Sequence, residues 1–146
     1  MSAEQNTALL RRIVDEAFNQ RKIDLFDELV ADDFVGHHFP PGLPPGREGL
    51  KSFMRTFWTA FPDIRFMFED EVAAGTKVAG RGHFVGTHHG EFMGIPPTGK
   101  RIDVKFHDIW RFDNGRWVEY WAQADNLTML QQLGAIPTPE PADNVR

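Results

Sequence analysis

The sequence predicts one α+β domain in which helices come first and long antiparallel strands follow. Apolar residues recur at helical spacing in three segments before residue 62. Beyond residue 64 apolar and polar residues alternate, as they do in strands with one buried face. Helices and strands that occupy separate blocks of the chain are typical of the α+β class. The chain has 146 residues, the size of one ordinary domain, so we expect a single domain at 1–135 and a flexible, proline-rich tail at 136–146.

Capping and breaking residues mark the ends of the N-terminal helices. Ser2 and Gln5 form a capping-box pattern, in which each side chain can bond the backbone N–H of the other residue. Pro62 helps to end the third helix because proline has no amide hydrogen. We therefore expect helices at 3–20, 24–30 and 47–61, with a short extended segment at 34–39 and a proline-rich loop at 40–45.

Turn residues divide the second half of the chain into strands. Asn114-Gly115 is typical of a hairpin turn, because both positions take a positive φ angle. Glycines and prolines between residues 89 and 99 predict a long connection rather than a tight hairpin. We expect strands at 64–72, 77–88, 102–112 and 116–124, followed by a helix at 126–133 that ends before Gly134. If this sheet curves, its inner face and the helices enclose a cone that can hold a ligand.

The register of the last hairpin can be predicted from its turn. A hairpin centred on the Asn-Gly turn pairs residues whose numbers sum to about 229. Arg111 then lies opposite Val118 rather than opposite Glu119, so the spacing alone does not assure an ion pair between Arg111 and Glu119.

The composition favours a small hydrophobic ligand over other partners. Thirteen Phe and four Trp against one Tyr predict an aromatic, dry interior. The net charge of -5 and the absence of any basic run disfavour a nucleic-acid partner. Cysteine is absent, which excludes disulfides, thiolate nucleophiles and zinc–sulfur sites. The histidines lack metal-ligand spacing and no glycine-rich phosphate loop is present, so we expect neither a metal nor another cofactor.

The sequence also suggests a location and an assembly state. The N-terminus has no apolar signal region and no segment is apolar enough to span a bilayer, so we expect a cytoplasmic protein without a membrane partner. A wide antiparallel sheet rich in aromatic residues rarely leaves both faces to water. We therefore expect a homodimer or a higher homo-oligomer that associates through the outer face of the sheet.

Several motifs together resemble those of the SnoaL-like polyketide (ester) cyclases, and they occur in the order found in that family. They are FPD at 61–63, GTHHGEFMGIPPTGK at 86–100, HDIWR at 107–111, EYW at 119–121 followed by Asp125, and QLG at 132–134. The resemblance implies the nuclear-transport-factor-2-like (NTF2-like) fold, a strongly bent mixed sheet with N-terminal helices around an apolar pocket. One departure is Tyr120, where family members often have His.

The resemblance also implies a reaction, which is the intramolecular aldol ring closure of an aromatic polyketide ester without metal or cofactor. The fold is shared by hydroxylases, isomerases, epoxide hydrolases and non-catalytic binding domains, so it does not fix the reaction. A hydroxylase, an epoxide hydrolase and a small-molecule binding domain therefore stay open as alternatives.

Asp125 occupies the general acid/base position of this family. An aldol closure needs a base for the proton on the activated carbon and a donor for the oxygen that becomes an alkoxide. If the last strand runs unbroken, Trp117 and Trp121 share a face with Asp125, and apolar surroundings would raise the pKa of its carboxyl. Asp125 also precedes Asn126-Leu127-Thr128 and is well placed as a helix N-cap. The resemblance favours the catalytic role.

Histidines and aromatic residues complete the predicted site. His107 and His88 fall in the motifs and are expected to assist Asp125, although each could instead be a surface or a hydrogen-bonded core histidine. Of the neighbours His37 and His38, only one should face inward, because side chains alternate along an extended chain. We expect five residues to bind the substrate, namely His37, Phe57, Trp58, Trp110 and Trp121.

Overall fold

The computed structural model describes residues 2–138 of the chain. Its N-terminal half contains α1 (Ala3–Arg12), the π-helical segment η1 (Ile13–Phe18), α2 (Asp24–Leu29), β1 (Val30–Gly36) and α3 (Arg47–Ala60). Its second half contains β2 (Arg65–Ala74), β3 (Lys77–Thr87), β4 (Arg101–Asp113), β5 (Arg116–Ala124) and α4 (Asn126–Gln132). The predicted α+β class is confirmed. Most of the tail predicted at 136–146 lies outside the described residues.

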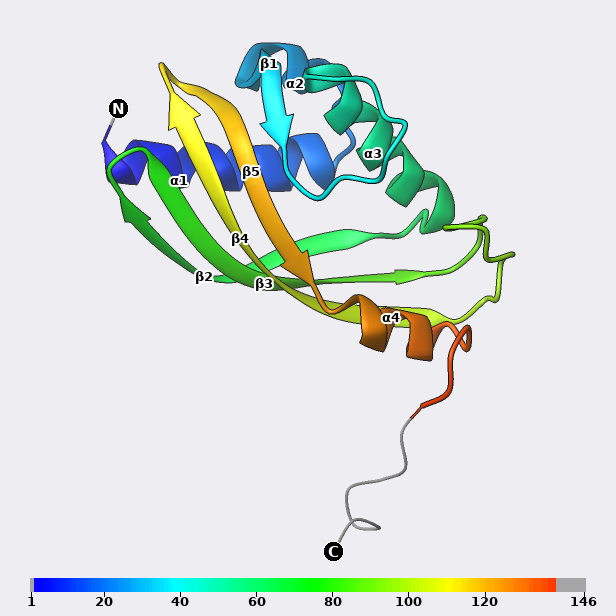
Figure 1. Ribbon diagram of the computed structural model, residues 1–146. Helices are drawn as coiled ribbons and strands as arrows, with labels where there is room; N and C mark the ends of the chain where they lie inside the picture. Colours follow the sequence, from blue (N-terminus) through cyan, green and yellow to red (C-terminus); the bar gives the residue numbers. More distant parts are fainter. Residues whose placement is uncertain (1, 139–146) are drawn as a thin grey trace, which may run out of the picture.

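The described strands form one curled, mixed sheet. Its strand order is β1-β5-β4-β3-β2, in which β1 runs parallel to β5 and the other neighbours are antiparallel. The N-terminal helices lie on the concave side of the sheet, and α4 follows β5 at one end (Figure 1). β1 begins earlier than the extended segment predicted at 34–39, because Val30 already pairs with Trp117 and is buried. The curled sheet therefore encloses an interior between itself and the helices.

The first predicted helix forms, but its hydrogen-bond period changes on the way. The predicted capping box is present, with the Gln5 N–H donating to Ser2 Oγ over 3.1 Å and the Ser2 N–H donating to Gln5 Oε1 over 2.8 Å. After Arg12 the helix widens to a π-helical turn, in which the Asn19 N–H donates to the Val14 carbonyl over 2.9 Å. Asn19 then bonds both backbone groups of Phe66 on β2, which ties the end of the helix to the sheet.

The concave face of the sheet is aromatic and rests on small residues of β3. Along β4 the even-numbered residues from Ile102 to Phe112 are buried and the odd-numbered ones are mostly exposed. A Cβ at Gly80 would lie 2.4 Å from the Phe68 ring, and one at Gly82 would lie 2.9 Å from the Phe106 ring. Glycine at these positions lets both rings lie directly on β3.

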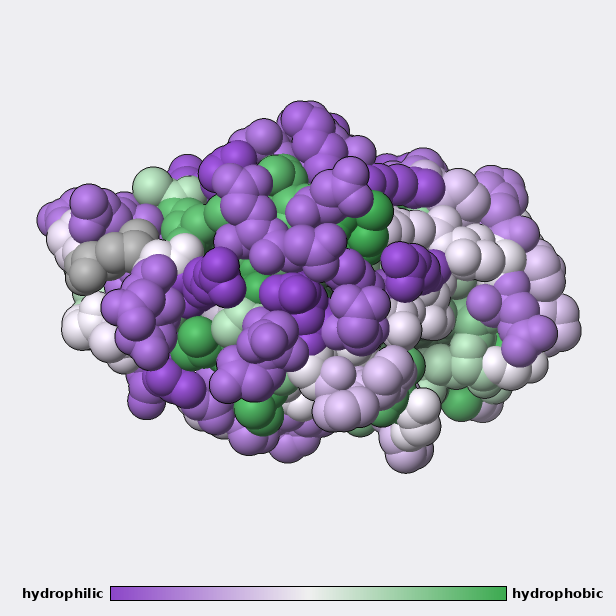
Figure 2. Space-filling view, turned by 90° about the horizontal axis from the view of Figure 1, so that it is seen from above, coloured by the Kyte–Doolittle hydropathy of each residue, from purple (hydrophilic) through white to green (hydrophobic). Residues whose placement is uncertain are grey.

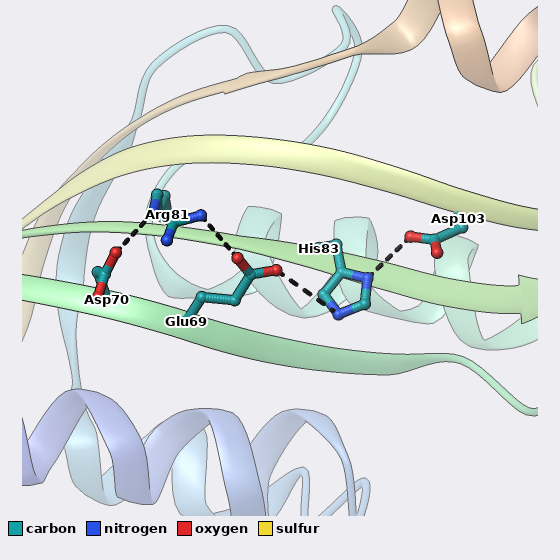
Figure 3. A network of polar contacts seen from close by, with 5 residues as sticks. All are labelled: Glu69, Asp70, Arg81, His83 and Asp103. Atoms are coloured by element: carbon teal, nitrogen blue, oxygen red, sulfur yellow. Dashed lines mark hydrogen bonds and ion pairs between the residues drawn. The ribbon is translucent and has the colours of Figure 1, made fainter.

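The outer face carries a chain of charged groups (Figure 3). A bulge in β2 between Phe68 and Asp70 turns both Glu69 and Asp70 outward. Both carboxylates lie 2.6 Å from the Arg81 guanidinium, and His83 continues the chain between Glu69 and Asp103. Exposed pairs of this kind contribute little stability each. Their main effect is to keep this edge of the outer face polar.

A second bulge corrects the predicted register of the last hairpin. Asn114 and Gly115 have the expected positive φ angles of 50° and 75°. Trp117 pairs with Phe112, but the next pair is Arg111 with Glu119, so Val118 is an extra residue in β5. Arg111 Nε consequently lies 2.8 Å from Glu119 Oε1 and the ion pair forms.

The same bulge separates two tryptophans that an unbroken strand would place on one face. Trp117 is fully buried on the concave side, where it stacks on Trp110 at 3.7 Å between ring centroids. Trp121 pairs with Ile109 and lies on the outer face. The prediction of a shared face was therefore wrong, because it assumed a strand without a bulge.

The surface seen from above is largely hydrophilic, and apolar residues show in patches between polar ones (Figure 2). Among residues 2–138, no helix has both the length and the apolar character needed to cross a membrane.

Candidate active site

A cavity of about 210 Å³ opens between the concave face of the sheet and the helices. Most of its wall is apolar and aromatic. This part of the wall includes Phe18, Phe39, Leu50, Phe53, Met54, Phe57, Phe66, Phe68, Phe84, Phe106, Trp110 and Trp117. The polar residues along its wall are His37, His38, Asp108, Tyr120, Gln123 and Asn126. Such a site suits a mainly apolar ligand that is oriented by a few polar groups.

Asp108 is the carboxyl group of this cavity. It lies in the middle of β4 between Phe106 and Trp110 and is only 5% exposed. The Trp110 indole Nε1–H donates a hydrogen bond of 3.0 Å to its Oδ2. Its Oδ1 is buried and has no hydrogen-bond partner among the described residues. Trp110 therefore fixes one oxygen of the carboxyl and leaves the other available.

Burial raises the pKa of Asp108 to about 7, although the Trp110 indole and the Tyr120 hydroxyl favour its ionised form. Burial, followed by the nearby Asp108, raises the pKa of Tyr120 well above its ordinary value, so the phenol stays neutral. A carboxyl with a pKa near neutrality can both take and give a proton, which is what a general acid/base requires.

The residues beside Asp108 leave room for its side chain. Gly80 of β3 and Ala122 of β5 lie directly opposite it in the sheet. A Cβ at Gly80 would approach Asp108 Oδ1 to 3.1 Å, tighter than an ordinary contact. The carboxyl is therefore flanked by small residues and faces the aromatic cavity.

Asp125 lies outside this cavity, contrary to the prediction that it shares an aromatic face. Its side chain is exposed and caps α4, with Oδ1 accepting from the Thr128 N–H over 3.1 Å and Oδ2 accepting from Thr128 Oγ1 over 2.7 Å. These two bonds lower the pKa of Asp125. The helix N-terminus that follows β5 draws the carboxylate away from the concave face.

The two predicted histidine partners do not meet Asp125 or each other. His107 has the parity of the exposed residues of β4 and points to the outer face, whereas Asp108 points inward. His88 is fully buried, but its Nδ1 accepts a hydrogen bond of 3.1 Å from the Thr98 N–H and its ring packs on Phe61. His88 thus anchors the 88–100 loop rather than lining the cavity.

The family follows from a comparison with known sequences. A family model described as SnoaL-like polyketide cyclase matches residues 8–133. The chain belongs to this family. A comparison with curated proteins found no match.

Solved structures with the SnoaL-like fold cover most of the chain. IdmH from Streptomyces antibioticus, a proposed polyketide cyclase, is 38% identical over 89% of this chain and 99% of its own, with a TM-score of 0.77. TsrD from Streptomyces laurentii is 25% identical over 93% of this chain and 99% of its own, with a TM-score of 0.84. AclR from Streptomyces galilaeus, a proposed hydroxylase, is 27% identical over 99% of this chain and 89% of its own, with a TM-score of 0.83. The predicted NTF2-like fold is confirmed.

Three of the five substrate-binding residues predicted for this SnoaL-like chain line the cavity, namely His37, Phe57 and Trp110. Trp121 lies on the outer face and stacks on the His37 ring at 5.0 Å. Trp58 lies between helices, where its indole N–H donates to the Phe18 carbonyl over 3.2 Å.

His37 and His38 both border the cavity of this SnoaL-like domain, but the His37 ring contacts Trp121 and Glu119, whose pairing with Ile109 and Arg111 places them on the outer face. His38 has a positive φ of 64°, which breaks the alternation just after β1. His37 Nε2 also lies 2.8 Å from Glu119 Oε2.

The sequence contained a signal for Asp108 besides its place in the HDIWR motif. Phe106, Trp110 and Phe112 share one parity on β4, and Asp108 is the charged residue at that parity. Burial of a carboxyl in the apolar face of a strand costs free energy, so a carboxyl at such a position is a candidate functional group. Tyr120, the departure from the family pattern, is its neighbour. Among residues 2–138, no three His, Asp or Glu side chains are arranged to hold a metal ion.

Proposed function

We propose that this SnoaL-like protein closes a ring in an aromatic polyketide-type ester by an intramolecular aldol reaction, with Asp108 as its general acid/base. The single observation that carries the proposal is a buried carboxyl, with a pKa raised to about 7, inside an aromatic cavity. This assignment replaces Asp125, which is exposed and bonded to Thr128.

The reaction would use the available oxygen of Asp108. In its ionised form Asp108 takes a proton from the activated carbon of the substrate, and an enolate forms. The enolate carbon attacks a carbonyl carbon of the same molecule, so that a C–C bond forms and the carbonyl oxygen becomes an alkoxide. Protonated Asp108 then returns the proton to this oxygen and regains its starting form. No oxidant or cofactor is needed for this sequence of steps.

The neighbours of Asp108 would support both forms of the carboxyl. The Trp110 indole holds Oδ2 and so directs Oδ1 to the proton transfer. The neutral Tyr120 phenol is a hydrogen-bond donor that can stabilise negative charge on the carboxylate or on the substrate oxygen. The aromatic wall would bind the flat, apolar part of the substrate, and His38 would contact its polar groups.

The test is turnover of a polyketide ester surrogate by the parent, Asp108→Asn and Asp125→Asn. Asn is nearly isosteric with Asp but cannot exchange a proton near neutral pH. Asp108→Asn should lose activity by about a hundred- to ten-thousand-fold, the usual contribution of a general acid/base. Asp125→Asn should keep it. Full activity of Asp108→Asn would refute the assignment.

A hydroxylase is the second candidate, because AclR, which is 27% identical, is a proposed hydroxylase. Mass spectrometry of the product separates the two reactions. An aldol product keeps the mass of the substrate or has lost water, whereas a hydroxylated product has gained one oxygen atom. A ligand that raises the melting temperature without being converted would indicate a binding domain instead.

A further inference from the structure

Asp108 belongs to a row of residues that crosses the sheet and ends in a second carboxyl group. Glu71 of β2 pairs with Gly80 of β3, and Gly80 pairs with Asp108 of β4. Residues paired in this way point to the same face of a sheet. The space above Gly80 is occupied by Asp108 Oδ1 and by the edge of the Phe68 ring. The Phe68 ring therefore makes the region between the two carboxyl groups apolar.

Glu71 is unusual for a glutamate because its side chain is only 4% exposed. Its Oε2 lies 2.8 Å from Arg11 Nη2 on α1, and the Arg11 side chain is 62% exposed. Its Oε1 is buried and has no hydrogen-bond partner among the described residues. Asp15 and Arg65 line the same surface depression. One partly solvated cation therefore balances a carboxylate that is otherwise enclosed.

We propose that Glu71, paired with Arg11, is a positioning residue of the active site, which acts across Gly80 to keep the proton on Asp108. The proposal rests on the role of Asp108 given above. The negative charge of Glu71 repels a negative charge on Asp108, and it raises the pKa of Asp108 in the same direction as burial does.

The size of the effect follows from the geometry of the sheet. Adjacent strands lie about 4.8 Å apart, so the backbones at Glu71 and Asp108 are separated by about 10 Å. At an effective dielectric constant of about 20, a full charge at this distance changes a pKa by about one unit. The positive charge of Arg11 reduces the effect of Glu71 on the pKa of Asp108 somewhat. The Arg11 side chain is mostly exposed to water, so its own charge acts only weakly on Asp108.

The other groups that face Asp108 are the same in the parent and in a variant at Glu71. In the sheet they are Trp110 and Tyr120, and at the rim of the cavity they are His37 and His38. The helical residues that line the same cavity do not titrate, and they are Phe18, Leu50, Phe53, Met54, Phe57 and Asn126. A substitution at Glu71 therefore changes one charge in an otherwise unaltered surrounding.

The matched pair of variants is Glu71→Gln and Glu69→Gln. Both remove one negative charge from β2, but Glu69 is on the outer face and bonds Arg81. The measurement is the NMR shift of the Trp110 indole N–H against pH, because this group bonds Asp108 directly. Glu71→Gln should lower the midpoint of that titration by about one pH unit, and Glu69→Gln should leave it in place. The pH dependence of turnover should move by the same amount.

An unchanged midpoint in Glu71→Gln overturns the proposal, and so does an equal shift in both variants. A thermal melt shows whether Glu71→Gln is folded. If it is not, Glu71→Met, which removes the same charge with a side chain of similar length, decides by the same criterion, and an unmoved midpoint in it would contradict the inference. The Trp110 titration does not require turnover. A shifted midpoint in a protein without cyclase activity would therefore refute the aldol reaction and still support the coupling of the two carboxyls.

Discussion

The difference in the free energy of unfolding between Asp108→Asn and the parent should shift in favour of the variant as the pH rises. In the folded parent burial raises the pKa of Asp108 to about 7 from an ordinary value of 3.8. A carboxyl with a raised pKa binds its proton more tightly in the folded state than in the unfolded state. Its stabilising effect is therefore complete below about pH 3.8 and is lost as the pH rises through 7. Asn does not ionise, so the variant loses no stability in this way at any pH.

The magnitude follows from the two pKa values. Their difference is about three pH units, and each unit corresponds to about 1.4 kcal/mol, so ionisation of Asp108 costs the folded parent about 4 kcal/mol above pH 7. The new amide keeps an oxygen for the Trp110 indole but buries N–H groups, which can cost about 1–3 kcal/mol. The cost of burying the N–H groups does not depend on pH. It therefore changes the free energy of unfolding of the variant by the same amount at every pH.

The assay is urea unfolding of the parent and of Asp108→Asn at several pH values between about 4 and 9. All other titrating groups are common to both proteins and cancel in the difference between the two free energies of unfolding. This difference should grow in favour of Asn up to about pH 7 and then level off. A difference that is the same at every pH would refute the conclusion that Asp108 is a buried carboxyl with a raised pKa.

Three further predictions concern the surroundings of the site and the assembly. Asp125→Ala should lower the free energy of unfolding by about 0.5–2 kcal/mol in a denaturant melt while turnover persists, and a large loss of turnover in the folded variant would restore a catalytic role to Asp125. Gly80→Ala should cost about 1–3 kcal/mol and reduce turnover, because its Cβ would meet the Phe68 ring and Asp108 Oδ1; parent-like stability would argue against this packing. We also expect association through the outer face, where Ile109 is 41% exposed and Trp121 lies beside it, so sedimentation should show a homodimer at micromolar concentration and a monomer would contradict this.

Local patterns in the sequence predicted most of the fold. The capping box at Ser2 and the Asn-Gly turn each act through nearby backbone groups, so their outcome could be foreseen from a few residues. Alternation likewise predicted β4, because each buried residue contributes separately to one face. The bulge at Val118 could not be foreseen in this way, since it depends on how β5 fits two neighbouring strands at once.

The site was predicted less well than the fold for a related reason. The motif placed Asp125 at the end of the last strand, but Thr128 and the helix that follows compete for its carboxylate. Asp108 could have been found from its parity, whereas its raised pKa depends on burial and on Glu71 of a distant strand, against the opposing hydrogen bonds of Trp110 and Tyr120. Only the assembled sheet brings these groups together.

The two small residues beside Asp108, Gly80 and Ala122, differ in the room that they leave for a longer side chain. One of the two positions is therefore open to substitutions that bring new chemistry to the site. Gly80 admits no side chain, because the Phe68 ring occupies the position of its Cβ. Ala122 lies on the other side of Asp108 and lines the same cavity, so a longer side chain there would project into the cavity next to Asp108. Substitution at position 122 with histidine, serine or a second acid would introduce a new functional group next to Asp108 while the β3 side of the site stayed fixed.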